Sequence, residues 1–140
     1  MDLYDWLLFL HVLSAALLVG GLTALWALVL GTRSTAPSID AESAMSFGRF
    51  AGILVGVGMM GTILLGIWLA IDVDGYEVWD GWILASLVLW AIGGWAGGKA
   101  GKEWAQDDPV AARRGGIRFQ AINTVAVLVI LVLMIWKPGA

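Results

Sequence analysis

Residues 6–32 form an uninterrupted stretch without one Asp, Glu, Lys or Arg side chain. A helix of this length would measure ~40 Å, which is enough to cross the ~30 Å hydrocarbon core of a bilayer. Three further uncharged runs follow, at residues 50–71, 81–98 and 119–136. Because lipid cannot satisfy backbone polar groups, these runs predict an all-α fold, a transmembrane four-helix bundle. With flanking residues included, the expected helices cover about 4–31, 47–71, 80–101 and 117–136.

Composition supports a membrane protein with one transmembrane domain over residues 1–140. Hydrophobic residues make up 60% of the chain and charged residues only 14%, against roughly 25% charged residues in soluble domains. The absence of cysteine excludes disulfides and thiolate-held metal centres. No basic patch of the kind that binds nucleic acid is present. The first six residues contain two acids and no base, so we expect the first segment to be retained and not cleaved as a signal peptide.

Almost all basic residues lie on one side of the expected membrane segments, and this asymmetry predicts an orientation in the membrane. Lys137 stands alone near the C-terminus, and the second loop carries four acids and no base. By the positive-inside rule, both termini and the second loop face outside, across the bacterial cytoplasmic (inner) membrane. The other seven basic residues flank or occupy the first and third loops: Arg33, Arg49, Lys99, Lys102, Arg113, Arg114 and Arg118.

Two loops contain helix signals. The first loop has a Pro-Ser start followed by a helix-compatible stretch, which predicts a short interfacial helix leading into the second membrane helix. In the third loop, Asp108 is placed as an N-cap and Pro109 as the first helical residue. The pair Gly115-Gly116 is expected to end a short turn of helix there.

Tryptophan is abundant, with nine residues, and most lie near the expected outer boundary. This distribution is typical of an aromatic belt that anchors helices at the membrane interface. An aromatic-lined site that opens outward is the alternative. The aromatic residues near the outer boundary are Tyr4, Trp6, Trp68, Tyr76, Trp79, Trp82 and Trp136; Trp95 and Trp104 suit the inner one.

Small residues recur at four-residue spacing in the second and third helices. Gly52 and Gly56 represent this pattern in the second helix, and Gly93 and Gly97 in the third. Glycines at this spacing allow helix backbones to approach closely, so we expect these four to mediate helix packing. The alternative is that they leave room for a flat cofactor or a lipid.

His11 is the only histidine, and it lies roughly 9 Å below the outer boundary. The same depth on the second and third helices corresponds to Gly66 and Ser86, so Ser86 is a candidate hydrogen-bond partner. An ionisable residue within a membrane is a functional hypothesis, and neutral imidazole is a common haem ligand. His11 is therefore a structural histidine, a haem or metal ligand, or part of a proton relay. Two axial ligands would require a symmetric dimer or a methionine, of which Met134 is nearest in depth.

Other chemistry is not indicated. Every Asp and Glu lies at a boundary or in a loop, which argues against an ion-coupled transporter. The histidine has no acid within its own helix span, so the chain lacks a nucleophile–base–acid set.

Three segments carry a resemblance: FLHVLSAALLVGGLTAL, GTILLGIWLA and WDGWILASLVLW. They resemble the first three helices of a family of small bacterial membrane proteins, described only as predicted integral membrane proteins of unknown function. The layout is also similar to copper-resistance-D-like domains and to the haem-binding protoporphyrinogen oxidase of the HemJ type. In the haem-binding relatives a first-helix histidine ligates haem, which implies that role for His11. Their later histidines or lysine have no counterpart here, so the resemblance does not extend to oxidase activity or copper handling.

The preferred hypothesis is a small, non-catalytic structural or cofactor-binding membrane module, oligomeric through its glycine faces. The alternative is a b-type haem protein in electron transfer or haem-linked oxidation, with His11 as axial ligand. A weaker alternative is an accessory subunit of a larger membrane complex. The expected partners are the lipid bilayer and a second copy or another membrane protein.

Overall fold

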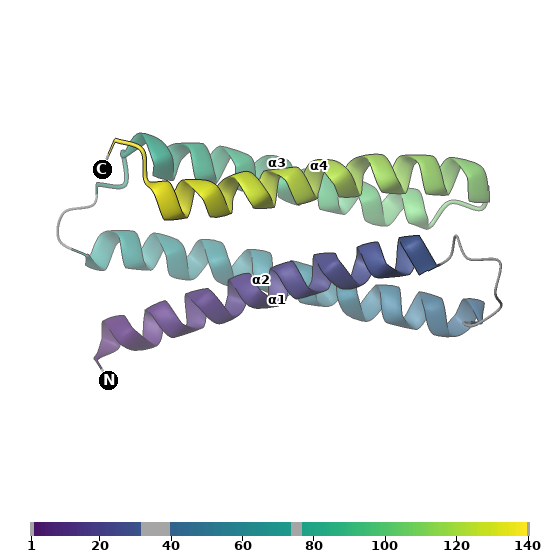
Figure 1. Cartoon of the computed structure of the whole chain (residues 1–140), viewed down its shortest axis with the longest axis horizontal. Helices are drawn as coiled ribbons and strands as arrows, with labels where there is room; N and C mark the ends of the chain where they lie inside the picture. Colours follow the sequence, from purple (N-terminus) through teal and green to yellow (C-terminus); the bar gives the residue numbers. More distant parts are fainter. Residues whose placement is uncertain (1, 32–39, 74–76, 140) are drawn as a thin grey trace. The chain divides into compact units, whose positions relative to one another are not determined.

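The computed structural model describes residues 2–31, 40–73 and 77–139. These ranges contain four α-helices and no strand: α1 (Leu3–Gly31), α2 (Ala41–Asp72), α3 (Gly81–Trp104) and α4 (Pro109–Trp136) (Figure 1). All four are long and apolar enough to cross a membrane. The all-α prediction with four membrane helices is therefore confirmed. The chain divides into two compact units, Met1–Leu69 and Ala70–Ala140.

In the first unit, α1 and α2 form an antiparallel hairpin that packs through glycines. A Cβ atom on Gly21 of α1 would lie 2.8 Å from Val55 Cγ2, and one on Gly58 of α2 would lie 2.5 Å from the Leu18 nitrogen. Neither position can therefore carry a side chain without moving the opposite helix. We call the row of contacts the glycine seam; its pairs are Gly48 with Leu28, Gly21 with Ala51 and Val55, Gly58 with Leu18, Gly61 with Ser14, and Gly66 with His11.

The predicted packing glycines of α2 do not lie in this seam. Gly52 and Gly56 are exposed, and a Cβ on either would meet no atom within 4 Å. The geometry of the α-helix explains the difference, because a step of four residues turns ~40° beyond a full circle. A strict four-residue stripe that starts at Gly48 consequently drifts away from α1, while the seam follows steps of three and four residues from Gly48 to Gly61.

In the second unit, α3 and α4 form the other antiparallel hairpin. Near the C-terminal end of α4, Ala70, Trp82 and Ile83 form a buried cluster, with Leu87 and Met134 packed against it. Both packing glycines predicted for α3, Gly93 and Gly97, are at least partly buried. Gly93 is buried, and a Cβ on Gly97 would lie 3.1 Å from Asn123 Nδ2 of α4.

The beginnings of α2 and α4 differ from the sequence prediction. Residues 41–46 are helical, as predicted, and they form one continuous α2 with the membrane segment. The Pro-Ser start of the loop and Arg33 lie outside the described residues. Asp108 caps α4 as predicted, because its side chain accepts a hydrogen bond from the Val110 nitrogen at 3.0 Å. The helix then continues through Gly115 and Gly116, which were wrongly expected to end it. Both glycines lie against α3 side chains, so they provide close approach instead of a helix stop.

Asp40 caps the first turn of α2. Its carboxylate accepts hydrogen bonds from the Ser43 backbone nitrogen at 2.7 Å and the Ser43 hydroxyl at 3.0 Å. These hydrogen bonds lower the pKa of Asp40 below the ordinary value of 3.8. The cap is therefore at full strength above that value and is lost as the pH falls through the lowered pKa.

We expect Asp40→Ala to fray residues 41–46, because no side-chain acceptor then remains for the first-turn N–H groups. Hydrogen-exchange protection factors of these amides at pH 7 should fall in this variant. Asp40→Asn is the matched control, since asparagine is also a good N-cap, and it should retain the protection and show no loss below pH 4. Equal protection in Asp40→Ala and the parent chain would contradict the cap.

The glycine seam makes a second prediction with a control on the same helix. Gly58→Ala should lower the free energy of unfolding by about 1–3 kcal/mol, because the added methyl collides with the Leu18 backbone. Gly56→Ala adds the same methyl to open space and should be neutral or stabilising, since alanine favours helix. Unfolding titrations in mixed detergent micelles measure both values. Equal effects of the two substitutions would place the α1–α2 contact elsewhere.

Candidate functional site

His11 lies on the face of α1 that packs against α2. His11, Ser14, Leu18 and Gly21 follow one another at three- and four-residue steps, which places them on one side of a helix. A Cβ added to a glycine of α2 would touch His11, Ser14 or Leu18, and a Cβ added to Gly21 would touch α2 itself. The imidazole is therefore held within the Met1–Leu69 unit by the same packing that joins its two helices.

The imidazole occupies space that a glycine leaves open. A Cβ on Gly66 would lie 3.0 Å from His11 Cε1, which is tighter than nine in ten real Cβ contacts, and 3.5 Å from Nδ1, which is ordinary van der Waals contact. Thr62 lies one turn earlier on α2, and its backbone lies close to the ring. Because Gly66 has no side chain, the ring can approach the α2 backbone at this level. Sequence depth had placed Gly66 opposite His11, and the structure brings the two together.

Two polar atoms at this position are buried without a hydrogen-bond partner among the described residues. They are Nδ1 of His11 and Oγ1 of Thr62. The nearby Ser14 differs, because its hydroxyl donates a hydrogen bond to the Leu10 carbonyl at 2.8 Å. A buried polar group without a partner costs about 1–3 kcal/mol, and it calls for a specific explanation such as a ligand or a water. We refer to His11, Thr62 and Gly66 as the His11 site.

The other predicted ligand residues belong to the second unit. Ser86 is buried, and its hydroxyl donates to the Trp82 carbonyl at 2.7 Å. Met134 packs against the cluster that contains Trp82. Their roles beside His11 remain predictions.

Helix α4 carries a second pair of buried polar side chains, Gln120 and Asn123, each only 3% exposed. Nε2 of Gln120 and Oδ1 of Asn123 have no hydrogen-bond partner among the described residues, and the Asn123 amide lies against Gly97. The pairing of an amide with a glycine on the neighbouring helix parallels the pairing of His11 with Gly66. These two positions are therefore where each hairpin combines close packing with unsatisfied polarity.

Sequence reasoning found His11 and the depth of Gly66 but missed Thr62. A single hydroxyl residue in an apolar helix usually bonds to its own backbone and carries no signal. The signal available was its spacing, because Thr62 lies four residues before Gly66 and on the same side of α2. Among the described residues, no group of three or more His, Cys, Asp or Glu side chains could hold a metal ion.

A comparison with protein families finds a match over residues 5–99, to the family described as "Predicted integral membrane protein (DUF2269)". The chain belongs to this family. The matched region includes α1 from residue 5 onward, all of α2 and most of α3, and it contains the whole His11 site. No curated protein matches the chain, and no solved structure matches it. The DUF2269 chain is thus a multi-pass integral membrane protein, and its role must be argued from its own residues.

The His11 site generates a prediction that uses the single histidine of this DUF2269 chain. Gly66→Ala should displace the imidazole by a few tenths of an ångström, because the new methyl presses on Cε1. In protein labelled with ¹⁵N-histidine, both ring nitrogen signals then come from His11 and should shift. Gly20→Ala on α1 is the control, since a Cβ there meets nothing within 4 Å. Unchanged ring signals in Gly66→Ala would show that the ring does not lie on Gly66.

Proposed function

We propose that this protein is a non-catalytic membrane module whose α1–α2 hairpin presents His11 to a cofactor within the bilayer. The observation that carries the proposal is the buried Nδ1 of His11, which has no hydrogen-bond partner among the described residues. A histidine retained only for packing would be expected to have both ring nitrogens satisfied or to be replaced by an apolar residue of similar size.

Haem b is the cofactor that this donor set fits best. The only histidine of the chain offers one imidazole ligand, and there is no cysteine to offer a thiolate. Gly66 lets the ring approach the α2 backbone, and the Thr62 backbone lies close to the ring. When bound, haem would supply one-electron redox chemistry, with His11 holding the iron.

The second axial position determines the expected assembly. Met59 and Met60 lie about two helical turns from Gly66 along α2, so neither shares the level of His11. A second copy of the chain would supply a second His11 through a symmetric dimer. We therefore propose a homodimer as the haem-binding form, with Met134 as the competing second ligand. The sorting of basic residues supports an orientation with both termini outside, in the inner membrane of a bacterium.

The test is a visible absorption spectrum of the protein purified in mild detergent from cells supplied with a haem precursor. We expect a Soret band in the parent protein and its loss in His11→Ala. Ser14→Ala is the matched control, because Ser14 lies one turn away on the same helix face and its hydroxyl bonds only to its own helix. It should retain the band, and Met134→Leu should retain it as well if the second ligand is a second His11.

The stability of the same variants separates a ligand from a packing residue. If His11→Ala loses the Soret band but unfolds at the same detergent concentration as the parent, His11 acts as a ligand. A colourless parent protein after haem supplementation would overturn the haem proposal. A Soret band that survives in His11→Ala would do the same.

A further inference from the structure

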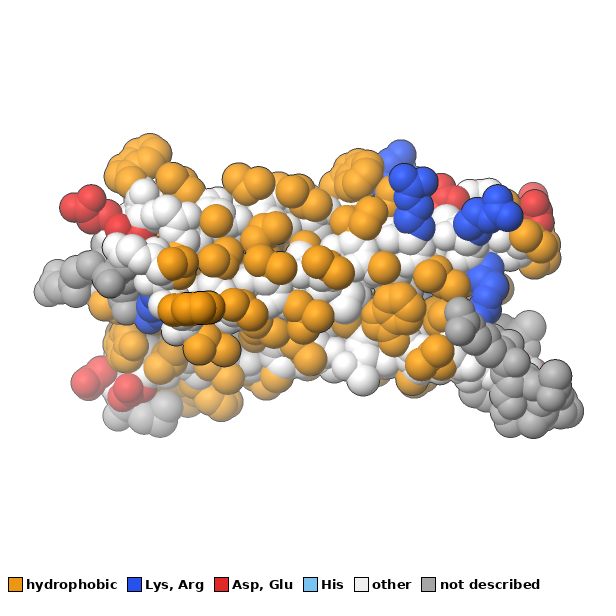
Figure 2. Space-filling model, turned by 45° about the horizontal axis from the view of Figure 1, so that its top comes forward, with side chains coloured by type: hydrophobic (Ala, Val, Ile, Leu, Met, Phe, Trp, Pro, Cys, Tyr) orange, Lys and Arg blue, Asp and Glu red, His pale blue; other side chains and the backbone are white. Residues whose placement is uncertain are grey.

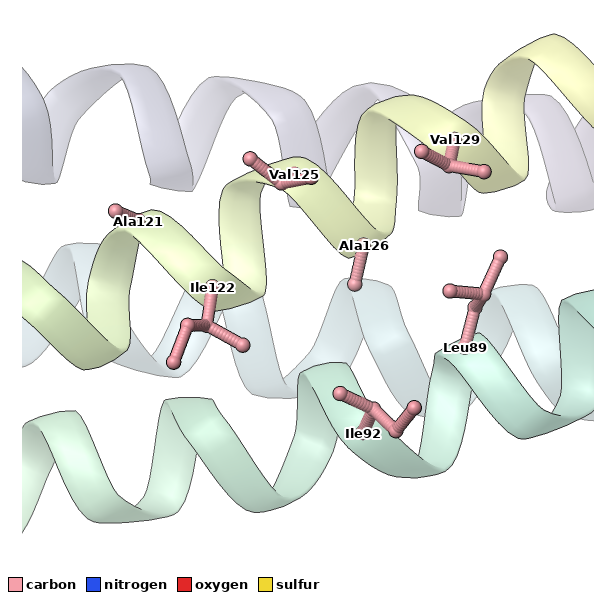
Figure 3. A pocket seen from close by; sticks show the side chains of 7 residues that line it. All are labelled: Leu89, Ile92, Ala121, Ile122, Val125, Ala126 and Val129. Carbon is pink, nitrogen blue, oxygen red and sulfur yellow. The ribbon is translucent and has the colours of Figure 1, made fainter.

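The α3–α4 hairpin contains an apolar groove of about 350 Å³. Leu89 and Ile92 line it from α3, and five residues of α4 line it from the other side, among them Ala121, Val125 and Val129. Figure 3 shows these side chains along the space between the two helices. Every residue that lines the groove is aliphatic, so it suits a hydrocarbon chain and offers nothing to a polar ligand.

Both walls of the groove continue in the same direction toward basic side chains. Lys99 lies seven residues after Ile92 on α3, and Arg118 lies seven residues before Val125 on α4. Seven residues are nearly two full turns, so each cation lies within ~20° of the groove-lining residue on its own helix. Lys99 and Arg118 are both exposed. The groove therefore leads to a pair of cations, one from each helix.

Other charges at this end strengthen the positive field. Lys102 and Arg114 are exposed one turn further along the two helices. Figure 2 shows Lys and Arg side chains gathered at this end of the hairpin, beyond a surface that is mainly hydrophobic. Three acids lie at the same end of the hairpin, fewer than the basic residues there: Glu103, Asp107 and Asp108. The Glu103 carboxylate lies against Gly115 and accepts a hydrogen bond from Gln106.

An aromatic pair marks the level at which apolar surface gives way to charge. Trp95 and Phe119 meet edge to face with ring centres 5.5 Å apart, and the Arg118 guanidinium lies 5.8 Å from the centre of the Phe119 ring. Aromatic rings of this kind concentrate at the boundary between hydrocarbon and headgroups. From Arg118 to Val129 the helix rises ~16 Å, which is about half of the ~30 Å hydrocarbon core. The groove and its basic end thus span one leaflet.

We propose that the α3–α4 hairpin binds an anionic phospholipid, with its phosphate on Lys99 and Arg118 and an acyl chain in the groove between Ile92 and Val125. The dimensions, the aliphatic lining and the two cations each match one part of such a lipid. The positive-inside rule accounts for the number of basic residues on this side, but it does not require two of them to continue the walls of a groove.

The test is native mass spectrometry of the detergent-purified protein titrated with palmitoyl-oleoyl phosphatidylglycerol or with phosphatidylcholine that has the same chains. We expect at least tenfold tighter binding of phosphatidylglycerol by the parent protein. Arg118→Gln should weaken that binding by about fivefold, the value of one basic residue near an anionic lipid. Arg49→Gln is the matched control, because Arg49 is an exposed arginine of α2 outside the α3–α4 hairpin, and it should change little.

Further variants separate the headgroup contact from the tail contact. Arg118→Lys keeps the charge and should keep the selectivity, which guards against a general loss of folding in Arg118→Gln. Ala121→Leu fills the groove and should weaken long-chain phosphatidylglycerol while leaving the dihexanoyl lipid unaffected.

Three results would overturn the proposal. The first is equal affinity for the two lipid headgroups in the parent protein. The second is an equal effect of Arg118→Gln and Arg49→Gln. The third is that the parent protein is a dimer and that Ala121→Leu makes it a monomer without changing lipid binding. A second copy of the chain, and not a lipid, would then occupy the groove.

Discussion

Close contact between α1 and α2 depends on glycines, because lipid removes the usual reason for helices to associate. Hydrocarbon chains solvate leucine as well as another helix does, so association must come from van der Waals contact and a few polar interactions. Gly21 and Gly58 bring the two backbones within the range where a Cβ would already collide. The position of His11 follows from this contact, since its ring fits the α2 surface only where Gly66 leaves room.

The polar side chains of the apolar helices fall into two groups according to their reach. Hydroxyls can bond to the carbonyl four residues earlier. The Thr62 hydroxyl has no hydrogen-bond partner among the described residues, but those of Ser14, Thr23, Ser86 and Thr124 all bond in this way. Such residues are self-sufficient in lipid and need no partner from another helix. Rings and amides are larger and point away from their own backbone, so they depend on neighbouring helices or on bound molecules. The unpaired atoms of the imidazole and the two amides therefore mark where an external partner would contribute most.

The sequence was sufficient to predict the number and type of helices, because an uncharged run in lipid must satisfy its own backbone hydrogen bonds and a helix does so. The starts of α2 and α4 could not be read from those runs, since a helix continues beyond the membrane wherever its caps and propensities allow. The Asp108 cap could be recognised because capping chemistry is local. The glycine seam could not be recognised from the sequence, because whether Gly56 or Gly58 contacts α1 depends on how the two helices cross. The His11 site was predictable in depth but not in its contact with Thr62, which also depends on that crossing.

The position of a charge carries information that its count does not. Seven of the eight basic residues lie on one expected side, which is far more than an orientation requires. A basic residue needed only for orientation could lie anywhere in the loop. Lys99 instead lies within α3, one turn beyond Trp95 toward the headgroups and in line with the wall of the groove. Its location beside the groove is therefore better explained by a contact that needs a cation at that depth, and a lipid phosphate is the anion that a bilayer provides there.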